Sequence, residues 1–185
     1  MPTRDGGELC YRVNERDEVV YVNDAWGPFA AANGVERLVG AGVLGRPLWE
    51  FISDPTTRGL YRDILARVRG GVPVRFPFRC DSPDRRRQMA MEVAAGPGGT
   101  VEFRSRVLAE ELRPPQPLLA CDRPHSGQFV RVCGWCKKVD VGGRWEEVEE
   151  AVSQLGLFEH HLLPQLTHGI CEGCYARMMD AIRGP

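Results

Sequence analysis

The sequence lacks the features that mark membrane, secreted and nucleic-acid-binding proteins. It holds no run approaching the roughly 18 apolar residues that a transmembrane helix needs, and no apolar signal core follows the start MPTRDGGELCYR. An excess of one charge is also missing, because 24 Lys and Arg against 25 Asp and Glu leave a net charge of −1. So balanced a chain has no electrostatic basis for binding nucleic acid or a membrane surface. We therefore expect a cytoplasmic protein whose cysteines stay reduced.

Histidine and lysine are scarce and confined to the last third of the chain. No histidine precedes His125, so a histidine-ligated haem is not expected in the first two thirds. The only two lysines, Lys137 and Lys138, are neighbours. The sequence also shows no phosphate-binding glycine loop, kinase signature or catalytic triad. It therefore does not predict an enzyme.

Residues 10–112 show the pattern of a small mixed domain. Asp54 and Pro55 fit the start of a helix, as N-cap and first helical residue, and a helical apolar stripe follows them. Strand-like runs and period-two alternation predict five strands, at 11–13, 19–22, 72–80, 89–93 and 101–107. Two strands, short helices, a longer helix and three strands fit an α+β fold: a five-stranded antiparallel sheet with helices on one face.

This order resembles the PAS domain, a small sensory and dimerisation fold. The resemblance lies in the segments YRVNERDEVVYVNDAW and VLGRPLWEFI, the longer helix, and the hairpin RCDSPDRRRQM. It implies that residues 10–112 sense a small ligand or bind a second subunit. A proline-rich stretch follows, and we expect residues 113–127 to be an extended linker. Residues 128–183 then form a second, smaller part.

Four cysteines in the second part form two C-x2-C pairs, Cys133 with Cys136 and Cys171 with Cys174. In a reduced compartment, two such pairs suit one tetrahedral metal ion, and we expect structural zinc. An iron–sulfur cluster stays open as an alternative. Neither pair is followed by histidine, so covalent haem is not expected. Four protein ligands leave no position for a catalytic water.

The second part also resembles a treble-clef zinc finger, in which a knuckle and a hairpin precede a helix that carries the second pair. Its segments VCGWCKK and THGICEGC resemble a module that accompanies PAS or receiver domains in bacterial signalling proteins. That resemblance implies the same four cysteine ligands. The usual module has proline after the third cysteine, where this chain has Glu172.

Three further residues could act around the metal. Lys137 and Lys138 follow Cys136 and could offset the −2 charge of a zinc ion with four thiolates; the alternative is that both are solvated. His168 precedes Cys171 by three residues. It could replace a cysteine ligand, but capping the helix or hydrogen-bonding a thiolate is favoured, because four cysteines already complete the tetrahedron.

Aromatic side chains of the first part could line a cavity for an apolar ligand, or they could fill the core, which is the favoured alternative. The residues are Trp26, Phe29, Trp49, Phe51, Phe76, Phe78 and Phe103.

The sequence thus predicts a non-catalytic signalling protein. A PAS-like part would bind a small ligand or form a homodimer, and a zinc module would contact a protein partner. Two alternatives stay open. The first is a DNA-binding regulator, which is opposed by an acidic helix that the stripe of Trp145, Val148, Val152 and Leu155 predicts. The second is a redox or metal sensor, which would release zinc when its cysteines are oxidised.

Overall fold

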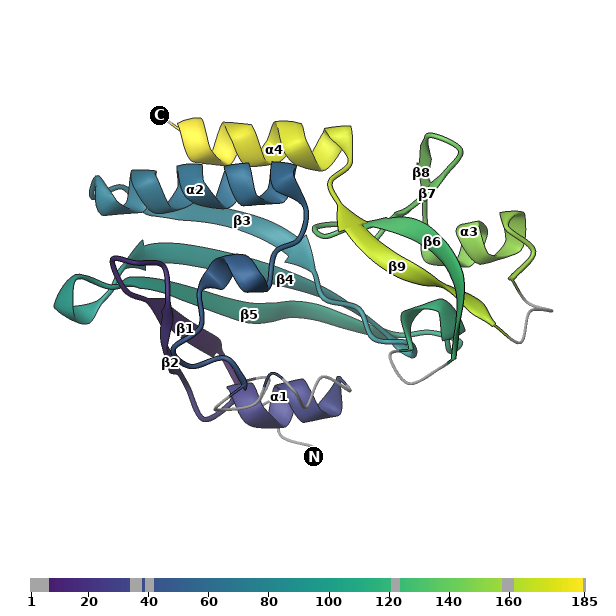
Figure 1. Ribbon diagram of the computed structural model, residues 1–185, viewed down its shortest axis with the longest axis horizontal. Coiled ribbons are helices and arrows are strands. Elements are labelled where there is room, and N and C mark those ends of the chain that lie inside the picture. The colour runs from purple at the N-terminus through teal and green to yellow at the C-terminus, as the bar shows by residue number, and fades with distance from the viewer. Residues whose placement is uncertain (1–6, 34–37, 39–41, 121–123, 158–161, 185) are drawn as a thin grey trace.

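The computed structural model describes residues 7–33, 38, 42–120, 124–157 and 162–184 (Figure 1). The first part is built on one antiparallel sheet with the strand order β2-β1-β5-β4-β3. Its strands are β1 (Leu9–Val13), β2 (Val19–Val22), β3 (Val74–Arg79), β4 (Arg85–Ala95) and β5 (Val101–Leu112). The helices are α1 (Trp26–Ala32), the short 3-10 helix η3 (Leu48–Glu50) and α2 (Pro55–Arg69).

Helix α2 begins as the sequence predicts. The carboxylate of Asp54 accepts a hydrogen bond from the Thr57 N–H at 2.7 Å, and Pro55 takes the first helical position. The apolar stripe of the helix is buried: Leu60, Ile64, Leu65 and Val68. This face packs on the sheet, because burying such a stripe is what stabilises a helix of this length.

Aromatic rings join the helices to one face of the sheet. Tyr11 on β1 stacks on Phe103 of β5 with ring centroids 4.5 Å apart, and Tyr61 of α2 lies 6.2 Å from Phe103. Trp26 of α1 meets Tyr11 edge-on at 5.6 Å. The opposite face carries ion pairs such as Arg12–Glu102 and Arg75–Glu92. The expected α+β class, with five antiparallel strands and helices on one face, is confirmed.

The second part consists of a small sheet and two helices. Its strands are β6 (His125–Cys133), β7 (Val139–Val141), β8 (Arg144–Glu146) and β9 (Leu163–Gly169), and its helices are α3 (Val148–Gln154) and α4 (Glu172–Arg183). The sheet order is β8-β7-β6-β9, with β6 and β9 parallel. The predicted sequence of a knuckle (residues 133–138), a hairpin (β7 and β8) and a closing helix (α4) is confirmed.

Two details of this part differ from expectation. The stripe of Trp145, Val148, Val152 and Leu155 predicts one helix, but Trp145 lies on β8, opposite Asp140 of β7. The tight turn at Gly142 and Gly143, both with positive φ, closes that hairpin and keeps Trp145 out of the helix. Strand β9 was not predicted, because its parallel pairing with β6 has no local turn signal.

The two parts share a hydrophobic cluster. Helix α4 lies beside α2 and covers the edge strand β3 (Figure 1). Trp135 of the knuckle and Met178 of α4 belong to the same buried cluster as Ile64 and Phe76 of the first part. The backbone N–H of Arg79, at the end of β3, also donates to the Trp135 carbonyl at 2.6 Å. The knuckle is therefore seated against the first part.

In the segment after β5, several side chains of residues 113–120 pack against the rest of the protein, while residues 121–123 of the predicted linker lie outside the described residues. The Arg113 side chain is 6% exposed and pairs with Asp81 at 3.3 Å and Glu149 at 3.1 Å. Gln116 and Leu118 are buried, the latter within the 3-10 helix η5 (Pro117–Leu119). A local proline pattern does not report these contacts, since their partners lie far away in sequence. The boundaries 10–112, 113–127 and 128–183 stay a prediction.

A buried ion network reinforces this junction. The Asp81 carboxylate, in the turn between β3 and β4, is fully buried and pairs with both Arg79 and Arg113. Arg79 reaches on to Glu147 at 2.7 Å, just before α3. Hydrogen bonds to these two carboxylates hold the pKa of Arg79 above its ordinary value, although burial alone would lower it. The hairpin of the first part is thereby tied to the start of α3.

Candidate metal centre

The four cysteines that the sequence singles out lie together. The sulfur atoms of Cys133, Cys136, Cys171 and Cys174 are all within 4.8 Å of one another, and those of Cys136 and Cys171 are 3.7 Å apart. Tetrahedral geometry with Zn–S bonds of about 2.3 Å requires sulfurs about 3.8 Å apart. A disulfide would need about 2.05 Å. The spacing therefore suits four thiolates around one ion.

A tight knuckle turn presents the first pair. The Cys133 N–H donates to the Lys138 carbonyl at 2.8 Å, and the Lys137 N–H returns to the Cys133 carbonyl at 3.0 Å. This turn holds Lys137 in the left-handed region, at φ 61°. The Gly134 N–H donates to the Gly169 carbonyl at 2.9 Å, which sets the knuckle against the end of β9.

The N-terminus of α4 presents the second pair. Cys171 is the N-cap, and its sulfur accepts from the Cys174 N–H at 3.4 Å. The Cys171 N–H in turn donates to the Cys133 sulfur at 3.5 Å. Free N–H groups and the positive end of the helix dipole stabilise thiolates at this position.

One hydrogen-bond donor to the cysteine sulfurs was not predicted from the sequence. Arg177 donates to the Cys174 sulfur at 3.0 Å from one helical turn further along α4. Its position three residues after Cys174, on a helix expected to begin at that pair, is the signal that could have found it. Lys137 instead donates to the Gly134 carbonyl at 3.0 Å. The metal-related roles of Lys137 and Lys138 stay predictions.

His168 lies outside the four-cysteine group. It is an exposed residue of β9, opposite Val132 in the parallel pair with β6. The geometry therefore gathers a closed set of four sulfur ligands without a histidine, and any role of His168 near the metal stays a prediction.

Contacts among the thiols shift their protonation. Hydrogen bonds from Cys136 and Cys174 lower the pKa of Cys133 well below its ordinary value. The contact with Cys133 raises the pKa of Cys136 to about 11, and the same neighbour raises that of Cys174. These shifts favour the thiolate form of Cys133, with hydrogen bonds from the thiols of Cys136 and Cys174. A bound cation would replace their protons, so its affinity rises with pH.

The chemistry of this set is that of a structural site. Four sulfur donors, three of them on buried cysteines, match the closed ligand set of structural zinc. The residues present therefore fit a zinc ion, and an iron–sulfur cluster uses the same donors. Neither would leave a position for an activated water.

The aromatic residues predicted to line a pocket are divided among several environments. Phe103 is fully buried in the core. Trp49 lies under the Arg62 guanidinium at 5.2 Å, and Phe29 lies 5.7 Å from that of Arg87. Trp26 and Phe51 line a cavity of about 210 Å³, and Phe51, Phe76 and Phe78 line a neighbouring one of about 240 Å³. Phe76 and Phe78 also line a third cavity, of about 300 Å³. No single pocket gathers all seven.

Residues outside the predicted set complete the cavities of about 210 Å³ and about 240 Å³. Tyr61 of α2 lines both of these cavities, and Trp135 of the knuckle lines the one of about 240 Å³. Trp135 is 6% exposed, and its ring lies 6.1 Å from that of Tyr61. The alternation and helical spacing of the first part could not point to Trp135, because it comes from the other part of the chain.

Comparisons with known proteins find only weak similarity to this chain. No protein-family model matches it, and no curated protein does. Among solved structures, a domain of an HTR-like protein from Haloarcula marismortui is 12% identical, with a TM-score of 0.38, over 55% of this chain and 98% of that one. A domain of a sensory box sensor histidine kinase/response regulator from Geobacter sulfurreducens is 21% identical, with a TM-score of 0.36, over 54% of this chain and 82% of that one. Neither likeness bears on function at these scores.

None of the helices in the described part of the chain is both long enough and apolar enough to cross a lipid bilayer.

Proposed function

We propose that this is a non-catalytic signal-transduction protein with a structural zinc ion. In this proposal the PAS-like part senses a small molecule or pairs with a second copy, and the zinc module presents a rigid surface to a protein partner. The observation that carries it is the closed four-sulfur cluster, seated beside the five-stranded antiparallel sheet. A closed cluster stabilises a fold and leaves no open coordination position for catalysis. A reducing compartment such as the cytoplasm would keep the thiols available.

The zinc ion would hold the module together and fix it to the sheet. Among the described residues of 128–183, Val132, Val139, Val148 and Val152 belong to a small hydrophobic cluster that also includes Leu118 from the preceding segment. A part of this size depends on metal or on a neighbour for stability. Knuckle and α4 both contact the first part, so a metal bridging them would transmit movement between the two parts.

Metal content is the direct test of this proposal. We expect the purified protein to carry about one zinc per chain, measured by plasma mass spectrometry, and to show no visible absorption. The variant Cys174→Ser should lose the metal, and Cys10→Ser, which replaces a buried cysteine outside the cluster, should keep it. A broad visible band together with iron would instead identify an iron–sulfur cluster.

Arg177 should tune how tightly the metal is held. Its guanidinium donates to a ligand sulfur, and loss of such an outer contact typically weakens metal binding about 10- to 100-fold. We expect Arg177→Gln to show that loss in chelator competition. The control Arg183→Gln removes the same charge from the last turn of the same helix. Equal affinities in the two variants would exclude a specific role for Arg177.

A further inference from the structure

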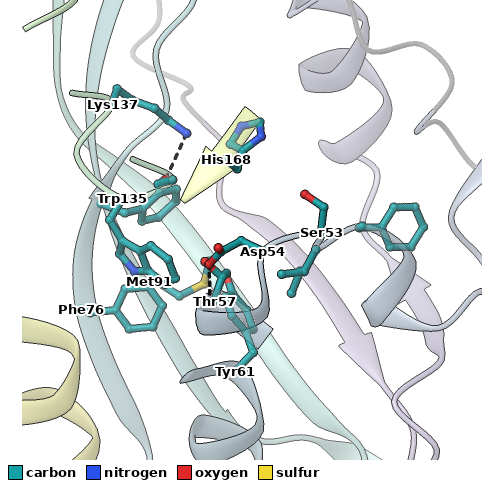
Figure 2. A pocket seen from close by; sticks show the side chains of 13 residues that line it. Ser53, Asp54, Thr57, Tyr61, Phe76, Met91, Trp135, Lys137 and His168 are labelled. Atoms are coloured by element: carbon teal, nitrogen blue, oxygen red, sulfur yellow. Dashed lines mark hydrogen bonds between the residues drawn. The ribbon is translucent and has the colours of Figure 1, made fainter. Parts of the chain in front are cut away.

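The cavity that Tyr61 and Trp135 both line lies at the junction of the two parts. It has a volume of about 240 Å³, is partly open to solvent, and is lined by residues of the start of α2, of β3 and β4, and of the knuckle and β9 of the metal module (Figure 2). Pockets that bury drug-sized molecules measure roughly 300–1,000 Å³. This cavity therefore suits a smaller molecule.

The walls of this junction cavity are largely aromatic. Tyr61, Phe76 and Trp135 surround its interior together with Met91 (Figure 2). Phe76 and Trp135 are both 6% exposed, so these surfaces are held in place by the core. Rigid aromatic walls favour a flat ring, which gains contact area and favourable ring–ring geometry.

Polar groups gather around this aromatic interior. Lys137 and His168 project from the module, and Asp54 stands at the start of α2 (Figure 2). The Asp54 carboxylate is engaged with the Thr57 N–H as the helix cap. Lys137 donates one hydrogen bond, to the Gly134 carbonyl, and an ammonium group has three donors. The positive end of the 15-residue helix α2 adds to the same field.

We propose that the junction cavity binds a small aromatic carboxylate. Its ring lies between Trp135 and Phe76, and its carboxylate faces Lys137 and His168. The inference deepens the proposed function by naming the ligand class and its place, and it rests on the sensory role proposed above. The cavity of about 210 Å³, lined by Tyr11, Trp26 and further apolar residues, is bounded by residues of the first part alone and lacks such a cation.

This position would couple the ligand to the metal module. Gly134, Trp135 and Lys137 lie within or next to the first cysteine pair, and they form one side of the cavity. A ligand held between this side and α2 binds the docked arrangement of the two parts better than a separated one. It therefore stabilises that arrangement by RT ln(1 + L/Kd), where L is the free ligand concentration.

Calorimetric titration of the zinc-loaded full chain tests the proposal, with 2-naphthoate as the probe and 2-naphthamide as its uncharged counterpart. We expect saturable binding of one naphthoate per chain, and binding of the amide at least about tenfold weaker, as loss of a charge-assisted hydrogen bond implies. Lack of saturation up to about 2 mM naphthoate would overturn the proposal. So would equal affinity for the amide.

Two variants with a matched control locate the site. Lys137→Gln should weaken naphthoate binding at least about tenfold. The control Lys138→Gln removes the same charge from the same turn, but Lys138 does not line the cavity. The affinity of this variant for naphthoate should therefore stay within about twofold of that of the parent protein. Thr57→Phe should fill the cavity and abolish binding, and it keeps the backbone N–H that Asp54 caps. Equal effects of the two lysine variants, or unchanged binding in Thr57→Phe, would contradict this location.

The outcomes also separate this inference from the proposed function. A zinc-containing protein that fails to bind naphthoate would overturn the junction site and leave the zinc module standing. Saturable naphthoate binding, lost in Lys137→Gln and Thr57→Phe, by a protein that carries no zinc would support the site and reject the structural zinc.

Discussion

Replacing Cys171 by serine is expected to unfold the module and to loosen the adjacent face of the first part. Structural zinc contributes apparent binding free energy on the order of 10 kcal/mol, comparable with the whole stability of a small domain. Cys171 supplies both a sulfur of the cluster and the N-cap of α4. Loss of Cys171 should therefore release α4 from α2 and β3, the two elements that α4 contacts in the structure.

Amide hydrogen exchange followed by mass spectrometry measures this effect segment by segment. We expect protection to be lost in α4, β7 and β8 and to fall in α2 and β3. Protection should persist in β1, β4 and β5, because the central strands keep a core of their own around Val93, Val101 and Phe103. A chelator added to the parent protein should give the same pattern.

The matched control for this experiment is Cys80→Ser. It replaces a half-buried cysteine of the first part that does not belong to the cluster. We expect its exchange pattern to match that of the parent protein. Full protection of α4 in Cys171→Ser, or after zinc is stripped, would show that packing against α2 holds the module without metal.

Truncation of Trp135 to alanine should produce the second large effect. The side chain is 6% exposed and packs in the cluster shared by the two parts, 6.1 Å from the Tyr61 ring. Removing a buried tryptophan costs about 3–5 kcal/mol. In a chain of this size each kcal/mol shifts the midpoint by about 2–4 °C, so Tm should fall by roughly 10 °C.

Metal content distinguishes this effect from damage to the cluster. The indole of Trp135 is not a ligand, so Trp135→Ala should retain zinc as the parent does. Phe129→Ala serves as the control, since Phe129 is 66% exposed and its truncation should change stability by at most about 0.5 kcal/mol. Thermal unfolding followed by circular dichroism gives the Tm of each of the two variants. A Tm for Trp135→Ala close to that of Phe129→Ala would show that the knuckle does not contribute to the core.

Local patterns accounted for most of the elements. The cap at Asp54, the stripe from Leu60 to Val68 and the alternation at Val74 and Phe76 each depend on residues a few positions apart. Such patterns report which face of an element is buried. The grouping of the four cysteines was also predictable from the sequence, because two C-x2-C pairs are typical of metal sites.

Only the tertiary structure decided what those buried faces contact. Trp135 enters the core of the first part, Asp81 is buried between two arginines, and β9 pairs in parallel with β6. Each arrangement joins residues distant in sequence, and its free energy depends on packing and desolvation that no local periodicity encodes. By itself the sequence determined the five strands, the main helix and the grouping of the four cysteines. The placement of the knuckle against the sheet, and with it the junction cavity, was decided by non-local packing alone.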